Sequence, residues 1–125
     1  MIHAFLIFVG GGAGAVCRHY FGLASLRLLG PGFPFGTLGV NIVGSLLMGL
    51  LIGYFVKSGS SENYRLLVAT GFLGGFTTFS AFSLDFANLW MRSSTAEALG
   101  YAAISVVCSI LAVFVGLMIM RGGTA

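Results

Sequence analysis

The ten residues GGFTTFSAFS, Gly74–Ser83, lie in the middle of the third of four long apolar stretches of the chain. Two adjacent glycines and two adjacent threonines are poor helix formers, so this segment predicts a break or a kink in a membrane helix. Backbone that is broken inside a bilayer is tolerated only where protein buries it or a polar cavity borders it. The stretch therefore predicts a third helix that is broken mid-membrane beside a polar site, with a simple kink as the alternative.

The composition around this stretch is that of an integral membrane protein. Hydrophobic residues make up 58% of the 125 residues, charged residues only 7%, and the mean hydropathy is +1.03. No water-soluble surface can be assembled from such a chain, and a spanning helix needs about 20 mainly apolar residues. We therefore expect an all-α protein, a single four-helix transmembrane domain over residues 1–125, with helices near residues 5–29, 35–55, 66–90 and 98–120.

The basic residues are distributed almost evenly between the two sides of the membrane. With four spans, Lys57, Arg65 and Arg121 fall on one side, and Arg27 and Arg92 fall on the other. Orientation follows the Lys/Arg bias of short loops, so three against two predicts a chain that inserts both ways round. Two copies of opposite orientation then form an antiparallel, dual-topology homodimer with a two-fold axis in the membrane plane. The alternative is a weakly oriented monomer.

Polar side chains inside the first two spans are unfavourable in hydrocarbon and so indicate a polar surface. Thr37, Asn41 and Ser45 follow i, i+4, i+8 spacing, which aligns them on one face of the second helix. The Asn41 amide has two candidate partners, an anion or a neighbouring helix. Arg18 is expected either to face water or a polar partner, or to extend its guanidinium to the nearer membrane surface.

The fourth span repeats this spacing with Tyr101, Ser105 and Ser109. Serines in membrane helices often bond the carbonyl four residues earlier, and that is the alternative to a polar path along this face. Close approach of the helices is predicted by glycine pairs at GxxxG spacing, which are Gly10/Gly14, Gly49/Gly53 and Gly71/Gly75.

The residues after the predicted break combine aromatic rings with hydroxyl groups. Phe79 and Phe82 are i, i+3 neighbours, as are Ser80 and Ser83. The edge of a phenyl ring is weakly positive and offers an anion a favourable contact, although membrane phenylalanines mostly face lipid or the core. Carbonyl groups freed by the break are candidate ligands for a small hard cation.

Three motifs together resemble those of one family of membrane proteins. GGFTTFSAFS, read with GTLGVNIVGS (Gly36–Ser45) and GGGAGAVCRHY (Gly10–Tyr20), is similar to the Fluc fluoride channels, also called the CrcB family. The resemblance covers nearly the whole chain, with the same size, number of spans and order of motifs. It implies a passive fluoride channel of the bacterial cytoplasmic (inner) membrane, an antiparallel homodimer in membrane lipid with two fluoride pores along the subunit interface.

The resemblance also implies a role for individual residues. Phe79 and Phe82 match the phenylalanines that meet fluoride edge-on, and Asn41 matches the pore asparagine. The remaining predicted pore residues are the hydroxyl-bearing Thr37, Ser80, Ser83, Tyr101, Ser105 and Ser109. Gly74 and Thr77 match the backbone carbonyls that, from both subunits, hold a structural sodium ion on the two-fold axis, and Arg18 matches a vestibule arginine.

Three positions depart from the pattern expected for this family. Ala81 stands where threonine is frequent, Asp85 stands where glutamate is expected, and the polar track of the last helix turns apolar at Val113. The departures at Ala81 and Asp85 remove none of the proposed ligands. The Val113 departure leaves the outer end of the polar track undefined.

Other functions are less well supported by the sequence. A small dual-topology, proton-coupled multidrug exporter needs a membrane-embedded carboxylate, ideally in the first helix, but that helix contains Arg18 and no acid, and Asp85 is the only acid within a span. In a non-transporting subunit of a larger complex, the polar residues would only join helices. His3 and His19 have no partners for a catalytic or metal site, so we expect no enzyme. The scattered basic residues predict no binding to nucleic acid.

Overall fold

The structure is a computed structural model that describes residues 2–59, 61–92 and 95–121 of the chain. Every regular element within these ranges is a helix. The elements are α1 (Ile2–Leu29), α2 (Phe35–Ser58), α3 (Glu62–Arg65), the π-helix η1 (Leu66–Leu73), α4 (Gly74–Phe76), α5 (Ser80–Arg92) and α6 (Thr95–Met120). Four segments are long and apolar enough to cross a membrane: α1, α2, Glu62–Arg92 and α6. The predicted all-α class with four spans is therefore confirmed.

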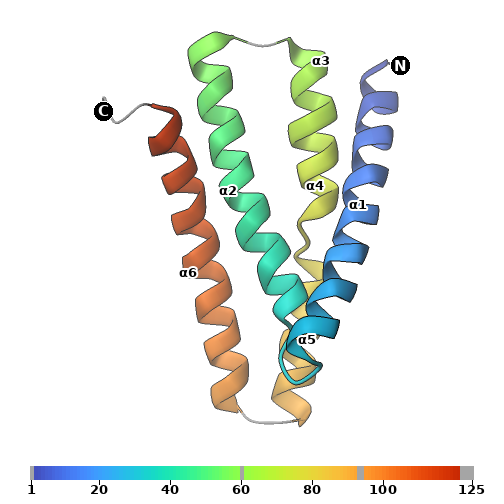
Figure 1. The fold of residues 1–125 in the computed structure, drawn as a ribbon, viewed down its shortest axis with the longest axis vertical. Helices are drawn as coiled ribbons and strands as arrows, with labels where there is room; N and C mark the ends of the chain where they lie inside the picture. The colour runs from blue at the N-terminus through green and yellow to red at the C-terminus, as the bar shows by residue number, and fades with distance from the viewer. Residues whose placement is uncertain (1, 60, 93–94, 122–125) are drawn as a thin grey trace.

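Glycines in the left-handed conformation end the first two long helices. Gly30 has φ +82° and donates its N–H to the Leu26 carbonyl at 2.9 Å, and Gly59 has φ +64° and donates to Phe55 at 2.8 Å. A side chain at such a position would be strained, so glycine suits these helix ends. The links that follow are short, and successive spans run in opposite directions (Figure 1).

The two ends of the bundle carry different parts of the chain (Figure 1). One end has the start of α1, the α2–α3 link and the end of α6. The opposite end has the α1–α2 link, with Arg27 nearby, and the end of α5 at Arg92.

Close packing between helices depends on glycines at two interfaces. On α1, a Cβ at Gly14 would collide with the Phe72 carbonyl of η1, and one at Gly10 would collide with the Leu67 carbonyl. Between α2 and α6, a Cβ at Gly116 would lie 2.6 Å from the Leu46 carbonyl oxygen. Small residues allow such backbone contact in membranes, where no hydrophobic effect drives helices together. These contacts set how each helix is rotated relative to its neighbours.

Most of the molecular surface is apolar. Only 11–22% of the residues in the most apolar part of each span are buried, and large side chains such as Phe8 and Val56 are 78% and 80% exposed. The most buried cluster is small, formed by Leu89, Ala98 and Tyr101. A surface of this kind is stable in hydrocarbon, where helices satisfy their own backbone groups.

Candidate functional site

The third span contains three residues outside any helix. The helix α4 ends at Phe76 and α5 begins at Ser80, and Thr77 has an extended backbone with φ −88° and ψ 159°. The Thr77 N–H and Oγ1 both donate to the Leu73 carbonyl, at 3.1 and 3.0 Å, and close the preceding turn. The Thr78 hydroxyl accepts the Ala81 N–H at 3.1 Å, which caps α5. The two threonines thus end one helix and start the next.

Asn41 of α2 bridges these three residues from the neighbouring helix. Its Oδ1 accepts the Thr78 N–H at 2.8 Å, and its Nδ2 donates to the Thr78 carbonyl at 2.9 Å. The side chain therefore supplies both partners that a continuous helix would have given Thr78. The sequence left two partners open for the Asn41 amide, an anion or a neighbouring helix. The structure shows a bond to the neighbouring third span, at Thr78. Since an amide group has two N–H donors, this bond uses one of them.

A groove with a volume of about 520 Å³ runs along this segment between α2 and α6. Its walls come from three parts of the chain that are far apart in sequence. The predicted site residues that line it are Asn41, Gly74, Thr77, Phe79, Phe82, Ser105 and Ser109, joined by Ser45 and Val113. The structure thus brings together seven of the twelve predicted site residues.

The aromatic part of the groove is formed by Phe79 and Phe82. Their ring centroids lie 5.5 Å apart with the planes inclined at 45°. Phe82 also packs against Tyr101, at 5.2 Å. Phe79 is 77% exposed, so this wall of the groove is open in a single chain.

The hydroxyls of Ser105 and Ser109 are buried and have no hydrogen-bond partner among the described residues. The alternative considered from the sequence, a bond to the carbonyl four residues earlier, is therefore not made by either serine. A buried polar group without a partner is unfavourable and calls for an explanation, such as an ion or water that the protein binds. Since both serines line the groove, their hydroxyls are available to a ligand there.

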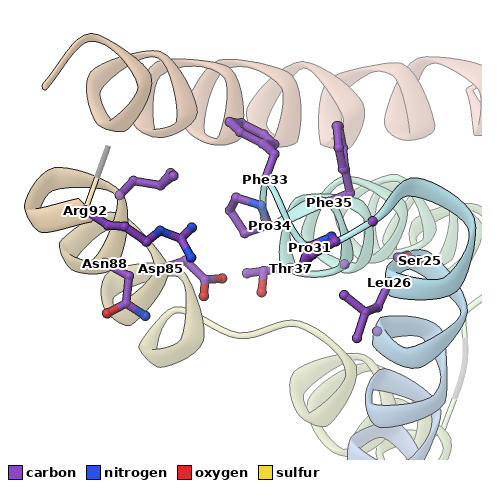
Figure 2. A pocket seen from close by; sticks show the side chains of 14 residues that line it. Ser25, Leu26, Pro31, Phe33, Pro34, Phe35, Thr37, Asp85, Asn88 and Arg92 are labelled. Carbon is purple, nitrogen blue, oxygen red and sulfur yellow. The ribbon is translucent and has the colours of Figure 1, made fainter. Parts of the chain in front are cut away.

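The other predicted hydroxyl residues lie elsewhere. Ser83 donates to the Phe79 carbonyl at 3.0 Å, and Ser80 lies 3.3 Å from the Thr78 hydroxyl, both exposed on α5 outside the groove. Tyr101 is fully buried and donates to Asp85 Oδ2 at 3.3 Å. Thr37 lines a separate cavity at the α1–α2 link, where Figure 2 shows it opposite Asp85.

Arg18 joins α1 to the end of α4. Its Nε donates to the Gly75 carbonyl at 3.1 Å. The side chain therefore has a polar partner within the bundle. A cation near the carbonyl end of a helix also interacts favourably with the helix dipole.

The carbonyls of Gly74 and Thr77 lose the donors that they would have in a continuous helix. The Thr78 N–H donates to Asn41, and the Ala81 N–H donates to the Thr78 hydroxyl. Carbonyl oxygens are suitable ligands for a hard cation. Within the part of the chain that the structure describes, no group of three or more His, Cys, Asp or Glu residues is placed to hold a metal.

Thr78 is predicted from the sequence to take part in the break, as one of two adjacent poor helix formers, but it is not among the predicted site residues, although it is central to the geometry. It bonds Asn41 through its backbone and caps α5 through its hydroxyl. One signal was available in the sequence. Threonine is a preferred N-cap residue, and Thr78 lies three residues before Ala81, whose N–H a cap at this position can accept. The sequence contained no signal for the contact between Tyr101 and Asp85, because these residues lie on different helices and 16 positions apart.

Comparison of the sequence with known proteins identifies its family. The family model described as CrcB-like protein, Camphor Resistance (CrcB), matches residues 5–117. A relative from Mesorhizobium japonicum named fluoride-specific ion channel FluC is 54% identical over 121 residues, 97% of this chain and 98% of that protein. A relative of the same name from Chelativorans sp. is 52% identical over 97% of this chain and 98% of its own length. Another from Rhodopseudomonas palustris is 49% identical over 95% of this chain and 97% of its own length. The chain therefore belongs to the CrcB-like family, as its three motifs predicted.

Proposed function

We propose that this protein is a fluoride-selective channel and not an enzyme, and that fluoride crosses the membrane along the groove. The observation that carries the proposal is the groove itself, where an amide, two phenyl rings and two buried hydroxyls lie together. Neither hydroxyl has a partner in the part of the chain that the structure describes. The names of the relatives agree with it. A passive pore needs no further chemistry from the chain.

The chemistry of these groups suits a small, strongly hydrated anion. The remaining N–H of Asn41 and the hydroxyls of Ser105 and Ser109 are hydrogen-bond donors, and the edges of Phe79 and Phe82 are weakly positive. Such donors replace the water of fluoride in a narrow path. None of them carries a full charge, so the ion is bound weakly enough to leave.

The open wall of the groove supports an antiparallel homodimer. Phe79 is largely exposed, so the groove with its polar Asn41 and Ser105 is open on that side, an unfavourable arrangement against lipid. A second copy with the opposite orientation closes the groove and buries these groups. Two-fold symmetry then produces two equivalent pores. In this dimer the interruption at residues 77–79 lies at mid-membrane, near the axis.

A sodium ion on that axis fits the freed carbonyls of Gly74 and Thr77. One chain offers two such oxygens and the dimer offers four, all of them neutral carbonyl oxygens of the kind that hard cations bind. When bound, the ion supplies a positive charge that holds the two copies together. A peak of density on the two-fold axis between these carbonyls, in a high-resolution map of the dimer, tests the assignment.

We place the channel in the bacterial cytoplasmic (inner) membrane. Fluoride that enters the cell as the neutral acid then leaves passively, down its electrochemical gradient. The proton-coupled drug exporter is not favoured, because its mechanism needs a carboxylate free to exchange protons. The first helix has none, and Asp85 is bonded to Tyr101.

Reconstitution into liposomes tests the function directly. The purified protein should release trapped fluoride, measured with a fluoride electrode, much faster than empty vesicles do. Chloride release from matched vesicles should remain at the background rate. Fluoride release at the rate of empty vesicles, or chloride release as fast as that of fluoride, would refute the proposal.

A further inference from the structure

Another cavity, separate from the groove, lies between α2 and η1 beside the end of α6. Its volume is about 350 Å³. We call it the apolar cavity, because leucine, valine, phenylalanine and methionine side chains line it, and the hydroxyl of Tyr54 is the one polar side-chain group among its lining residues. It shares no lining residue with the groove.

The apolar cavity and the groove use opposite faces of α2. Leu50 lies nine residues after Asn41, which at about 100° per residue places it half a turn away. In the proposed dimer the second copy covers the groove, so the apolar cavity is left facing the lipid. Leu47 and Tyr54 in its wall are 39% and 48% exposed, and the cavity is therefore open toward the hydrocarbon.

An acyl chain is the filling that suits this space in a membrane. An empty cavity loses the dispersion contacts of its walls. A buried water molecule needs two to four polar partners, and the Tyr54 hydroxyl alone does not supply them. A flexible hydrocarbon chain needs no such partners and adapts to the shape of the walls. The apolar cavity is therefore suited to one chain of a lipid.

Each element that lines the apolar cavity also carries a basic residue near the outer end of its lining. These residues are Lys57, three positions after Tyr54; Arg65, three positions before Val68; and Arg121, next to Met120. All three lie at the end of the bundle that carries the α2–α3 link (Figure 1). Basic residues just beyond the apolar part of membrane helices lie at the depth of the lipid headgroups and attract anionic ones.

Two groups on α2 are available to such a headgroup. Lys57 is exposed and lies one turn beyond Tyr54 on α2. Neither the Lys57 ammonium nor the Tyr54 hydroxyl has a hydrogen-bond or ion-pair partner among residues 2–59, 61–92 and 95–121. Of the three acidic residues of the chain only Glu62 lies at this end, and its carboxylate is 3.5 Å from His3 of α1. The charge at this end is therefore complementary to an anion.

We propose that the apolar cavity is a binding site for an anionic glycerophospholipid, with one acyl chain in the cavity and the phosphate beside Lys57 and Tyr54. The site goes beyond the proposed function and uses none of the residues of the groove. The cavity alone would accept the chain of any lipid, and the basic end selects a headgroup with net negative charge. In the proposed antiparallel dimer, two-fold symmetry gives each leaflet one such site.

Native mass spectrometry of the purified full-length protein tests the site by measuring the affinity for the first bound lipid. The probes are phosphatidylglycerol and phosphatidylcholine with identical acyl chains, which both contain a phosphate but differ in net charge. Lys57→Gln is compared with Arg27→Gln, which removes the same charge at the opposite end of the bundle. Val68→Phe, which fills the cavity, is compared with Val107→Phe, which adds the same volume at an exposed position outside it.

We expect the wild-type protein to bind phosphatidylglycerol more tightly than phosphatidylcholine. Lys57→Gln should lose about fivefold in affinity for phosphatidylglycerol, the effect of one basic residue near the headgroups. Val68→Phe should bind both lipids more weakly, because the acyl chain is displaced. Arg27→Gln and Val107→Phe should match the wild type.

Three results would overturn the inference: equal wild-type affinities for the two lipids, equal affinities of Lys57→Gln and Arg27→Gln for phosphatidylglycerol, or wild-type binding of both lipids by Val68→Phe. A wild type that retains no lipid, together with a Val68→Phe protein that no longer forms dimers, would assign the cavity to a second copy of the chain. The melting temperature without lipid shows whether Val68→Phe folds, and if it does not, the charge variants decide. None of these measurements uses fluoride efflux, so failure of the proposed function is recognised separately.

Discussion

At the scale of single residues, two serines of α6 have buried hydroxyls with no hydrogen-bond partner among the described residues. Ser58 and Ser83 each donate to the carbonyl four residues earlier, whereas neither Ser105 nor Ser109, which line the groove, makes such a bond within residues 2–59, 61–92 and 95–121. A buried group that the protein itself leaves unsatisfied is a candidate for binding the transported ion.

Replacement of these hydroxyls should therefore affect conduction and not stability. We expect Ser105→Ala and Ser109→Ala each to lower fluoride efflux by about tenfold, the effect of one hydrogen bond of about 1.4 kcal/mol. Because no bond within the protein is lost, the melting temperature in detergent should not fall. Ser58→Ala, which removes an exposed serine bonded to its own helix, is the control. Unchanged efflux together with a lower melting temperature would show that the hydroxyls have a structural role.

Asn41 combines two functions that the sequence presented as alternatives. It holds the non-helical segment through Thr78, and it lines the groove. Its bonds to a fixed backbone orient the amide, so the remaining N–H has a defined direction.

The substitution Asn41→Asp separates shape from chemistry at this position. Aspartate keeps the acceptor for the Thr78 N–H but loses the donor and brings a negative charge beside an anion path. We expect fluoride efflux to fall about 100-fold or more, corresponding to about 3 kcal/mol, while gel filtration still shows an assembled protein. Asn63→Asp makes the same change at an exposed position of α3 and should have little effect. Normal efflux from Asn41→Asp would remove this residue from the pore.

At the scale of helices, the glycines of the three GxxxG pairs all lie against a neighbouring helix, whereas some glycines outside the pairs do not. Gly14 contacts the backbone of η1 and α4, whereas Gly12, two residues earlier on α1, has no atom within 4 Å of the position that a Cβ would occupy. The GxxxG pattern predicted close packing, and the structure shows which glycines make it.

This difference predicts unequal effects of the same substitution. Gly14→Ala places a methyl group against the Phe72 carbonyl and should destabilise the protein by about 1–3 kcal/mol, the usual range for overpacking. Gly12→Ala should leave stability unchanged or slightly higher, because alanine is the better helix former. Thermal unfolding in detergent, followed by the fluorescence of Trp90, measures both. Equal melting temperatures would contradict the packing described for α1.

At the scale of the whole molecule, a chain that buries so little of its surface depends on its surroundings. The groove is open beside Phe79, and the charge bias between the two ends is small. Both features are explained if the working unit contains two copies of opposite orientation.

Charge variants that fix the orientation test this assembly. The first variant combines Ser58→Lys with Asn63→Lys, which gives five basic residues at the end of the α2–α3 link and leaves two at the opposite end. The second variant combines Leu28→Lys, Gly32→Lys and Lys57→Gln, which gives four basic residues at the end of the α1–α2 link and leaves two at the other end. Because orientation follows this bias, each variant alone should insert one way and lose fluoride efflux. Co-expression of the two should restore it. Full efflux from either variant alone, with its single orientation shown by labelling from outside, would rule out the antiparallel dimer.

The sequence by itself determined the class of this protein, its four spans and its family. These follow from local properties: hydropathy over about 20 residues identifies a span, and three short motifs identify the family that the comparison then confirmed. Helical spacing also showed that Thr37, Asn41 and Ser45 share one face of α2.

Only the tertiary structure decided which polar residues meet. Asn41 and Ser45 line the groove while Thr37 lines a separate cavity at the α1–α2 link. Ser105 and Ser109 have no hydrogen-bond partner within the described part of the chain, while Tyr101 is bonded to Asp85. Spacing fixes the face of a helix on which a residue lies, but the rotation of that helix is set by backbone contacts far away in sequence, such as Gly14 with Phe72 and Gly116 with Leu46. The neighbours of each polar side chain therefore depend on packing that no single segment of the sequence contains.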